Sequence, residues 1–291
     1  MREFKTYNPI VNFTYFLSAI GFSMFMMHPA FLCISLICAI MCSVMETGIK
    51  KTLKTLLMLL PFVILMGAIN PLFNHRGATI LAYFPNGNPL TAESVYYAVG
   101  SSAMLLSVIL YFSCYNKVIT SDKFIYLFGK TVPVLSLVLS MVLRFIPRMG
   151  LQIKEIINGQ KALGKSPSKG NIITKCRQWA KILSILISWS LENAIEVSDS
   201  MKSRGYGLPG RTAFSIFRFD KRDTVALGWI IINSVIVLTG IFTGYTYYSY
   251  FPVLTLNTSG ISILFYISYL MLLITPFIIE RRESVRWNAL R

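Results

Sequence analysis

Six apolar runs, each long enough to cross a lipid bilayer, constrain this chain more than any other feature. They are Val11–Met27, Pro29–Met45, Leu53–Ile69, Ala92–Ser113, Val225–Phe242 and Ile261–Ile279. A bilayer core is about 30 Å thick, so a spanning helix needs about 20 mostly apolar residues. Lipid offers no hydrogen bonds to an open backbone, and such runs therefore fold as helices. We predict an all-α integral membrane protein with about six transmembrane helices.

The composition fits this class and narrows the partners. Of 291 residues 54% are hydrophobic and 14% charged, and 28 lysines and arginines against 12 acidic residues give a net charge of +16. In a soluble domain this charge would indicate binding to nucleic acid. Here, positively charged cytosolic loops that face anionic lipid account for it. We expect membrane lipids as partners and no nucleic acid. The five cysteines lack a disulfide or metal-ligand spacing, so we expect them to be reduced.

The positions of the basic residues predict the orientation of the chain in the membrane. They gather after the second run and after the sixth, at Lys50, Lys51, Lys54, Arg281, Arg282 and Arg286. The loops on the other side, near His28, at 70–91 and at 243–260, carry only Arg76. The positive-inside rule then predicts a multi-pass protein with both termini in the cytosol.

A long basic segment from Arg144 to Arg222 interrupts the apolar pattern. Charge at mid-bilayer costs about 2.5–3.5 kcal/mol per residue, so this segment must lie in the cytosol or along the inner face. We divide the chain into four N-terminal spans (1–116), a module of interfacial and cytosolic helices (117–222) and two spans with a basic tail (223–291). The apolar stretch Pro133–Met141 cannot cross without placing the basic segment outside. We predict that 133–147 is interfacial or half-inserted and kinked at Pro147.

Two long helices are predicted in this module, at about Arg148–Leu163 and Lys175–Arg204. On the second, Ser190, Ala194 and Ser198 recur at every fourth residue. A stripe of small residues lets two helices cross closely, although ordinary helix packing would use it equally well. We predict a crossing of the two helices at this stripe.

The two helices end alike. The first tip reads Lys161-Ala162-Leu163-Gly164-Lys165-Ser166-Pro167, and the second reads Lys202-Ser203-Arg204-Gly205-Tyr206-Gly207-Leu208-Pro209. In each, a glycine suited to a left-handed C-cap is followed by a basic loop with a proline. Because the whole ending is duplicated, we predict two docking tips. Arg204 lies in the last turn, where the helix dipole favours a cation, and its planar fork suits a carboxylate on another chain.

At this point the chain resembles, over nearly its whole length, the transmembrane coupling subunit (T component) of energy-coupling factor (ECF) transporters. Members of that family carry two Ala-Arg-Gly-type motifs at the ends of cytosolic coupling helices, the second usually in a phrase like Ala-Met-Glu-Ala-Arg-Gly-Tyr. The segment Ser200–Tyr206 is similar to this phrase, and Leu143–Pro147 resembles the one that opens the coupling region. Asn70–His75 and Thr120–Lys123 also resemble family sequence.

The resemblance implies a bacterial cell-membrane subunit of an ABC-type importer for a vitamin or a transition-metal ion. Each tip would insert into one of two ABC-type ATPase subunits, and one separate membrane subunit would bind the substrate. ATP would be bound by the partners, so no catalytic, cofactor or metal site is expected in this chain. The first motif reads Ala162-Leu163-Gly164 and lacks the arginine. Its ion pair is then absent or supplied by Lys161 or Lys165, which makes the first docking site more hydrophobic and argues against a symmetric mechanism.

The spans themselves favour a subunit that does not bind solute. Apart from Glu46 and Glu93 near their ends we expect no buried charge in the spans, and we single out Asn233 as the strongly polar residue in mid-span. An ion-coupled carrier normally needs ionisable residues along its path. A self-sufficient carrier stays as an alternative, and it would require a polar path.

Other motifs point to further alternatives. Gly159–Ser166 matches the phosphate-binding P-loop pattern, but that pattern works only between a strand and a helix, and here a helix precedes it. Asp220–Asp223 could belong to an enzyme acting on a lipid diphosphate, yet a second acidic cluster is absent, so we expect a cap on the fifth span. His28 and His75 are expected in loops. A plain anionic-lipid surface would show steep salt dependence and tolerate Arg204→Lys.

Overall fold

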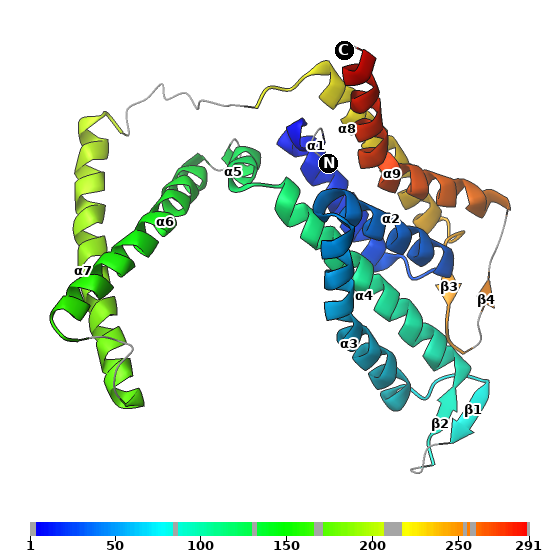
Figure 1. Ribbon diagram of the computed structural model, residues 1–291. Coiled ribbons are helices and arrows are strands. Elements are labelled where there is room, and N and C mark those ends of the chain that lie inside the picture. The colour runs from blue at the N-terminus through cyan, green and yellow to red at the C-terminus, as the bar shows by residue number, and fades with distance from the viewer. Residues whose placement is uncertain are drawn as a thin grey trace. The chain divides into compact units, whose positions relative to one another are not determined.

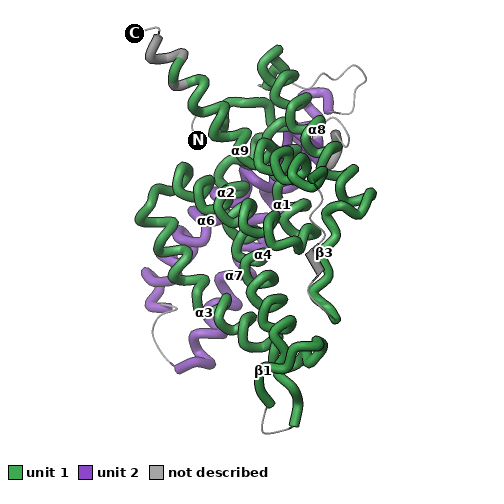
Figure 2. Tube along the Cα trace, turned by 90° about the vertical axis from the view of Figure 1, so that its right-hand side faces the viewer, with its two compact units in different colours: residues 1–123, 217–291 green, residues 124–216 purple. Residues whose placement is uncertain are grey.

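The computed structural model describes residues 4–83, 87–129, 133–165, 171–206, 217–252, 255–256 and 260–289. These residues form nine α-helices, a short 3-10 helix and two small hairpins. The chain divides into two compact units (Figure 2): unit 1 contains 1–123 and 217–291, and unit 2 contains 124–216. With six long apolar helices, the protein is an all-α integral membrane protein, as the sequence predicted.

Unit 1 holds most of the elements. They are η1 (Phe4–Thr6), α1 (Pro9–Phe25), α2 (Pro29–Thr47), α3 (Ile49–Phe73), β1 (Ile80–Tyr83), β2 (Pro89–Thr91), α4 (Ala92–Val118), α8 (Lys221–Phe242), β3 (Tyr248–Ser249), β4 (Thr255–Leu256) and α9 (Gly260–Ala289). Helix α4 packs against α1, α2 and α3, and α9 packs against α2 and α8 (Figure 1). Tyr15, Tyr111 and Tyr269 are fully buried in the core between these helices. Their hydroxyls are bonded, for example Tyr15 to the carbonyl of Leu273 at 3.0 Å, which removes the cost of burying a free polar group.

The predicted spans correspond to helices. Five of the six apolar runs lie in α2, α3, α4, α8 and α9, each long and apolar enough to cross a membrane. The first run forms α1, whose 17 residues stand at the lower end of the spanning range. The remaining long apolar helix is α6, Pro133–Ala162.

The course of α6 corrects one prediction. We expected a new helix from about Arg148, but one helix runs from Pro133 through Pro147 to Ala162. The interfacial or half-inserted position of 133–147 and the kink at Pro147 stay predictions. An internal proline costs about 3 kcal/mol, because it removes one N–H and crowds the carbonyl of Leu143. Packing on α7 (Ile172–Ser203) offsets this cost. Phe145 stacks on Trp189 with ring centroids 5.8 Å apart, and the Arg148 guanidinium lies 5.5 Å from the same ring.

The hairpins in unit 1 were not predicted, and they explain a buried carboxylate. Strand β1 pairs antiparallel with β2, and the loop before β1 lies over the start of α4. Glu93 accepts hydrogen bonds there from the amides of Thr79 at 3.1 Å and Ala78 at 3.3 Å. The other carboxylate near a span end, Glu46, forms an ion pair with Lys5. Both charges noted in the sequence therefore have partners.

Unit 2 contains fewer elements than unit 1 and buries less of their surface. It comprises α6, α7 and most of α5 (Ser121–Gly129), and α6 crosses α7 (Figure 1). On α7 only Ile182, Leu186 and Asn193 are buried. Each of the two long helices therefore exposes most of its surface to whatever surrounds it.

Candidate functional site

The first tip ends α6 in a defined C-cap. The amide of Gly164 donates to the carbonyl of Lys161 at 3.0 Å, and the amide of Lys165 donates to that of Gln160 at 2.9 Å. These two bonds define a Schellman motif. Gly164 has φ +73°, a value that a residue with a Cβ adopts only with strain. The predicted left-handed glycine cap is confirmed here.

The second tip repeats this geometry at the end of α7. The amide of Gly205 donates to the carbonyl of Lys202 at 3.0 Å, and the amide of Tyr206 donates to that of Met201 at 3.1 Å. Gly205 has φ +78°. The two tips therefore share one backbone arrangement, and Leu163 and Arg204 occupy the same C-cap position in it. Residues 166–167 and 207–209, which belong to the predicted tips, lie outside the described residues.

Both C-cap side chains are exposed. Leu163 is 69% exposed, and its neighbours Lys161, Ala162 and Lys165 are exposed as well. Arg204 is exposed, and its guanidinium has no hydrogen bond or ion pair with any residue that the structure describes. An exposed leucine and an exposed arginine, which has no bonded partner among the described residues, have the accessibility that contact with another chain requires.

The rest of the second tip is bonded within its own helix. The Ser203 hydroxyl donates to the carbonyl of Ser200 at 2.9 Å. Lys202 lies 3.7 Å from the carboxylate of Asp199, and both side chains are largely exposed. Such a pair contributes about 0–1 kcal/mol and leaves Lys202 available to solvent.

The predicted crossing stripe lies beside the packing seam. Ser190 is half-buried, but Ala194 and Ser198 are exposed. The seam between α6 and α7 instead contains Trp189, in contact with Phe145 and Arg148. The stacked aromatic pair, which the sequence analysis missed, could have been found from Phe and Trp on the apolar sides of both helices.

A second, unpaired stripe on α7 is apolar. Leu183, Ile187, Leu191 and Ile195 recur at every fourth residue and are each at least 51% exposed. Four such side chains form one continuous face of the helix. Contiguous exposed apolar surface marks a place where another apolar body binds.

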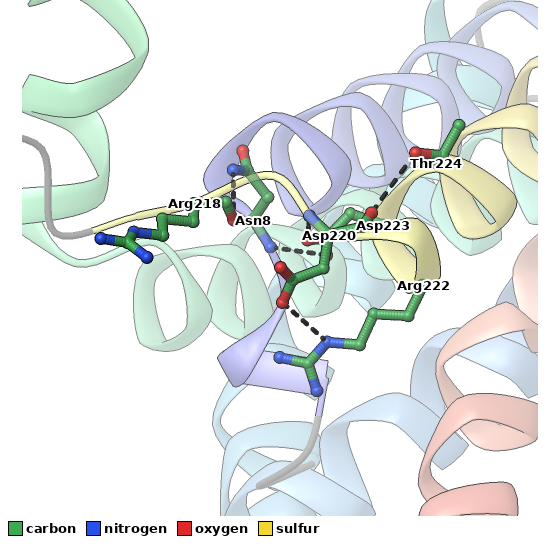
Figure 3. A network of polar contacts seen from close by, with 6 residues as sticks. All are labelled: Asn8, Arg218, Asp220, Arg222, Asp223 and Thr224. Atoms are coloured by element: carbon green, nitrogen blue, oxygen red, sulfur yellow. Dashed lines mark hydrogen bonds and ion pairs between the residues drawn. The ribbon is translucent and has the colours of Figure 1, made fainter.

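The aspartates at the start of α8 form a cap on that helix (Figure 3). Asp220 is the N-cap residue of α8, and its amide donates to the Asp223 carboxylate at 3.0 Å. The other oxygen of Asp223 accepts from the amide of Asn8 at 3.1 Å. Among the described residues no group of three His, Cys, Asp or Glu side chains could hold a metal ion. The predicted capping role is confirmed.

The other motifs set aside in the sequence also have structural roles. Gly159–Ala162 lies in the last turn of α6, so the P-loop pattern there follows a helix and lacks the strand that phosphate binding requires. His28 is the N-cap of α2, with its Nδ1 accepting from the amide of Ala30 at 3.2 Å. Burial lowers the pKa of His28. The histidine is thus a loop residue, as expected.

Known proteins provide an independent comparison. The chain is 36% identical over 107 residues to the energy-coupling factor transporter transmembrane protein EcfT of Lactobacillus helveticus. It is 38% identical over 113 residues to EcfT of Lacticaseibacillus paracasei and 32% identical over 119 residues to EcfT of Staphylococcus aureus. These alignments cover 36%, 38% and 40% of this chain and 39%, 41% and 44% of the relatives. No protein-family model matches the chain.

Proposed function

Taking the chain, on the strength of these relatives, as a T component of the energy-coupling factor transporter family, we propose that it is the coupling subunit of an ABC-type importer. Its two tips dock on two ABC-type ATPase subunits. The helices α6 and α7 pass the movement of those subunits to a separate substrate-binding membrane subunit, for uptake of a vitamin or a transition-metal ion. ATP is bound by the partners, and this chain holds no cofactor.

The repeated tip geometry carries this proposal. Two helix ends with the same backbone bonds, each presenting one exposed C-cap side chain, suit two related grooves on a pair of similar partners. Both helices are basic at these ends, with Lys161, Lys165, Lys202 and Arg204. Cationic tips favour an acidic groove, and Arg204 can bind a carboxylate through two parallel hydrogen bonds.

The exposed apolar stripe on α7 supports contact with the third partner, the substrate-binding membrane subunit. Leu183, Ile187, Leu191 and Ile195 have no counterpart on α6 in the described residues. We assign this face to the substrate-binding membrane subunit, whose surface is itself apolar. The positive-inside pattern supports a cytosolic position for the tips and both termini.

The experiment is co-purification with the host's candidate ATPase pair in mild detergent. Wild-type chain should retain both ATPases, Arg204→Glu should lose most of them, and Leu163→Ala should retain an intermediate amount. Arg204→Glu reverses a charge that the groove must pair, and leaving two carboxylates in contact is more costly than losing an apolar contact.

A matched charge reversal serves as the control. Lys181→Glu makes the same change in net charge on the same helix, at an exposed side chain outside both tips. It should keep most of the ATPase. Equal and small effects of Arg204→Glu and Leu163→Ala would eliminate the two-tip interpretation, and a wild-type chain without ATPase would eliminate the coupling role.

A further inference from the structure

The two places where unit 2 joins unit 1 are far apart in the sequence but contact the same short segment. Unit 2 follows Lys123 and ends before Phe217, so these two connections carry every covalent link between the units. The shared segment is Phe4–Asn12, which we call the clasp. It contains η1 and the first turn of α1, and Phe4, Asn8 and Asn12 are each at most 2% exposed.

The first connection is bound to the clasp through Lys123. Its ammonium is 5% exposed and donates to the carbonyl of Lys5 at 2.7 Å. When the Asn12 amide is turned so that its oxygen faces the Lys123 ammonium, Asn12 accepts from Lys123 at 2.8 Å and donates to the carbonyl of Phe4 at 3.1 Å. Burial, with a smaller contribution from the charge of Lys5, lowers the pKa of Lys123 to about 8. The side chain therefore still carries its charge for most of the time at pH 7.

The second connection is bound to the clasp through three contacts (Figure 3). The Asp223 carboxylate, 1% exposed, accepts from the amide of Asn8 at 3.1 Å. The Asn8 side-chain amide donates to the carbonyl of Arg218 at 3.4 Å. The guanidinium of Arg222 lies 5.1 Å from the ring centre of Tyr7, within the range of a cation–π contact.

The clasp is itself fixed to the core. Phe4 packs edge-on against Tyr15, with ring centroids 5.4 Å apart, and lies 6.4 Å from Phe16. Lys5 pairs with Glu46 at the end of α2. A displacement of either connection must therefore act on buried, mutually bonded groups, which transmit strain because packed interiors are nearly incompressible.

We propose that the clasp is the mechanical joint of the protein, with Asp223 and Lys123 as positioning residues that make the two connections of unit 2 move together. Movement that reaches unit 2 then displaces the starts of α5 and α8 together, through their shared bonds to the clasp. The source of that movement rests on the proposed function, but the linkage between the two connections does not.

The linkage is tested in the full-length chain alone, by hydrogen–deuterium exchange in nanodiscs. Asp223→Asn keeps the shape of the side chain and weakens its bond to the amide of Asn8. Exchange should rise at least tenfold at residues 5–8 and at least threefold at 119–123, although no hydrogen bond or ion pair joins Asp223 to the described residues 119–123. Asp199→Asn removes the same charge at an exposed side chain of α7, outside the clasp and both connections, and it should change neither region.

The linkage is also tested from the first connection to the second, so that the conclusion does not depend on one variant that folds poorly. Lys123→Met should raise exchange at 217–223 at least threefold, whereas the exposed Lys117→Met should not. If each variant loosens only its own connection, the joint is refuted. The variants are also taken through the ATPase co-purification, where retention in all of them is expected because the tips are unchanged. If the wild-type chain itself retains no ATPase, the proposed function fails, but the exchange test of the joint is unaffected.

Discussion

The two tips have the same backbone and different chemistry. Gly164 and Gly205 adopt nearly equal positive φ values, and both helices close with the same pair of main-chain bonds. The C-cap side chain is leucine in one and arginine in the other. The shared geometry presents a single exposed residue at each helix end. If the tips dock as proposed, that residue makes the two docking sites unequal, and we expect one apolar contact and one ionic contact with the ATPases.

The strongest way to break this comparison is to exchange the two side chains. The double variant Leu163→Arg with Arg204→Leu keeps the composition and the net charge of the chain. It should weaken retention of the ATPases by about 3–4 kcal/mol, roughly a hundred- to thousandfold, because each groove receives the wrong chemistry. Titration of labelled ATPase onto the purified chain measures this loss. An exchange without effect would show that the tips are interchangeable.

A milder change tests the geometry of the ionic contact. Arg204→Lys keeps the charge but loses the planar fork, so it should weaken docking by about 1.5–3 kcal/mol, on the order of ten- to a hundredfold. The same titration at increasing salt concentration separates the two explanations. If Arg204→Lys binds like the wild type and both affinities fall steeply with salt, the tip is a nonspecific cationic surface.

The apolar tip should respond less. Leu163→Ala removes three carbon atoms from a side chain that docking would bury, which costs about 1–2 kcal/mol, roughly five- to thirtyfold in affinity. Its salt dependence should equal that of the wild type, since no charge is altered. Leu163→Met, of similar volume, is the control and should bind within about threefold of the wild type. A loss from Leu163→Ala as large as that from Arg204→Lys would contradict the ranking of the tips.

The sequence predicted those parts of the molecule whose cause is local. The apolar runs determine the long helices, because an apolar stretch of spanning length has few alternatives. Glycine after a helix determines the caps of both tips, and Asp220–Asp223 follows the pattern of a helix N-terminus. The proposed division at 116 and 222 stays a prediction, as does the docking role of the tips.

What the sequence did not reveal depends on distant contacts. The helix through Pro147 persists because Phe145 and Arg148 pack on Trp189 of another helix. Two of the three residues of the small-residue stripe are exposed, and the stacking of Phe145 on Trp189 across the two helices was not predicted. The bond from Asn8 to Asp223 joins residues 215 positions apart, and no periodicity in a single sequence indicates it.

The smallest expected effect comes from substitutions that test whether the two C-caps have the same backbone stability. Gly164→Ala and Gly205→Ala each place a Cβ on a residue with positive φ, which costs roughly 1 kcal/mol. Since the bonds at the two caps correspond one to one, the two substitutions should raise amide exchange in the last turn of their own helix by the same factor, about fivefold. Exchange measured on the chain alone excludes any effect of a partner's groove. A clear difference between the two factors would mean that the tips differ in backbone stability as well as in side chain, and the unequal docking could then no longer be assigned to Leu163 and Arg204 alone.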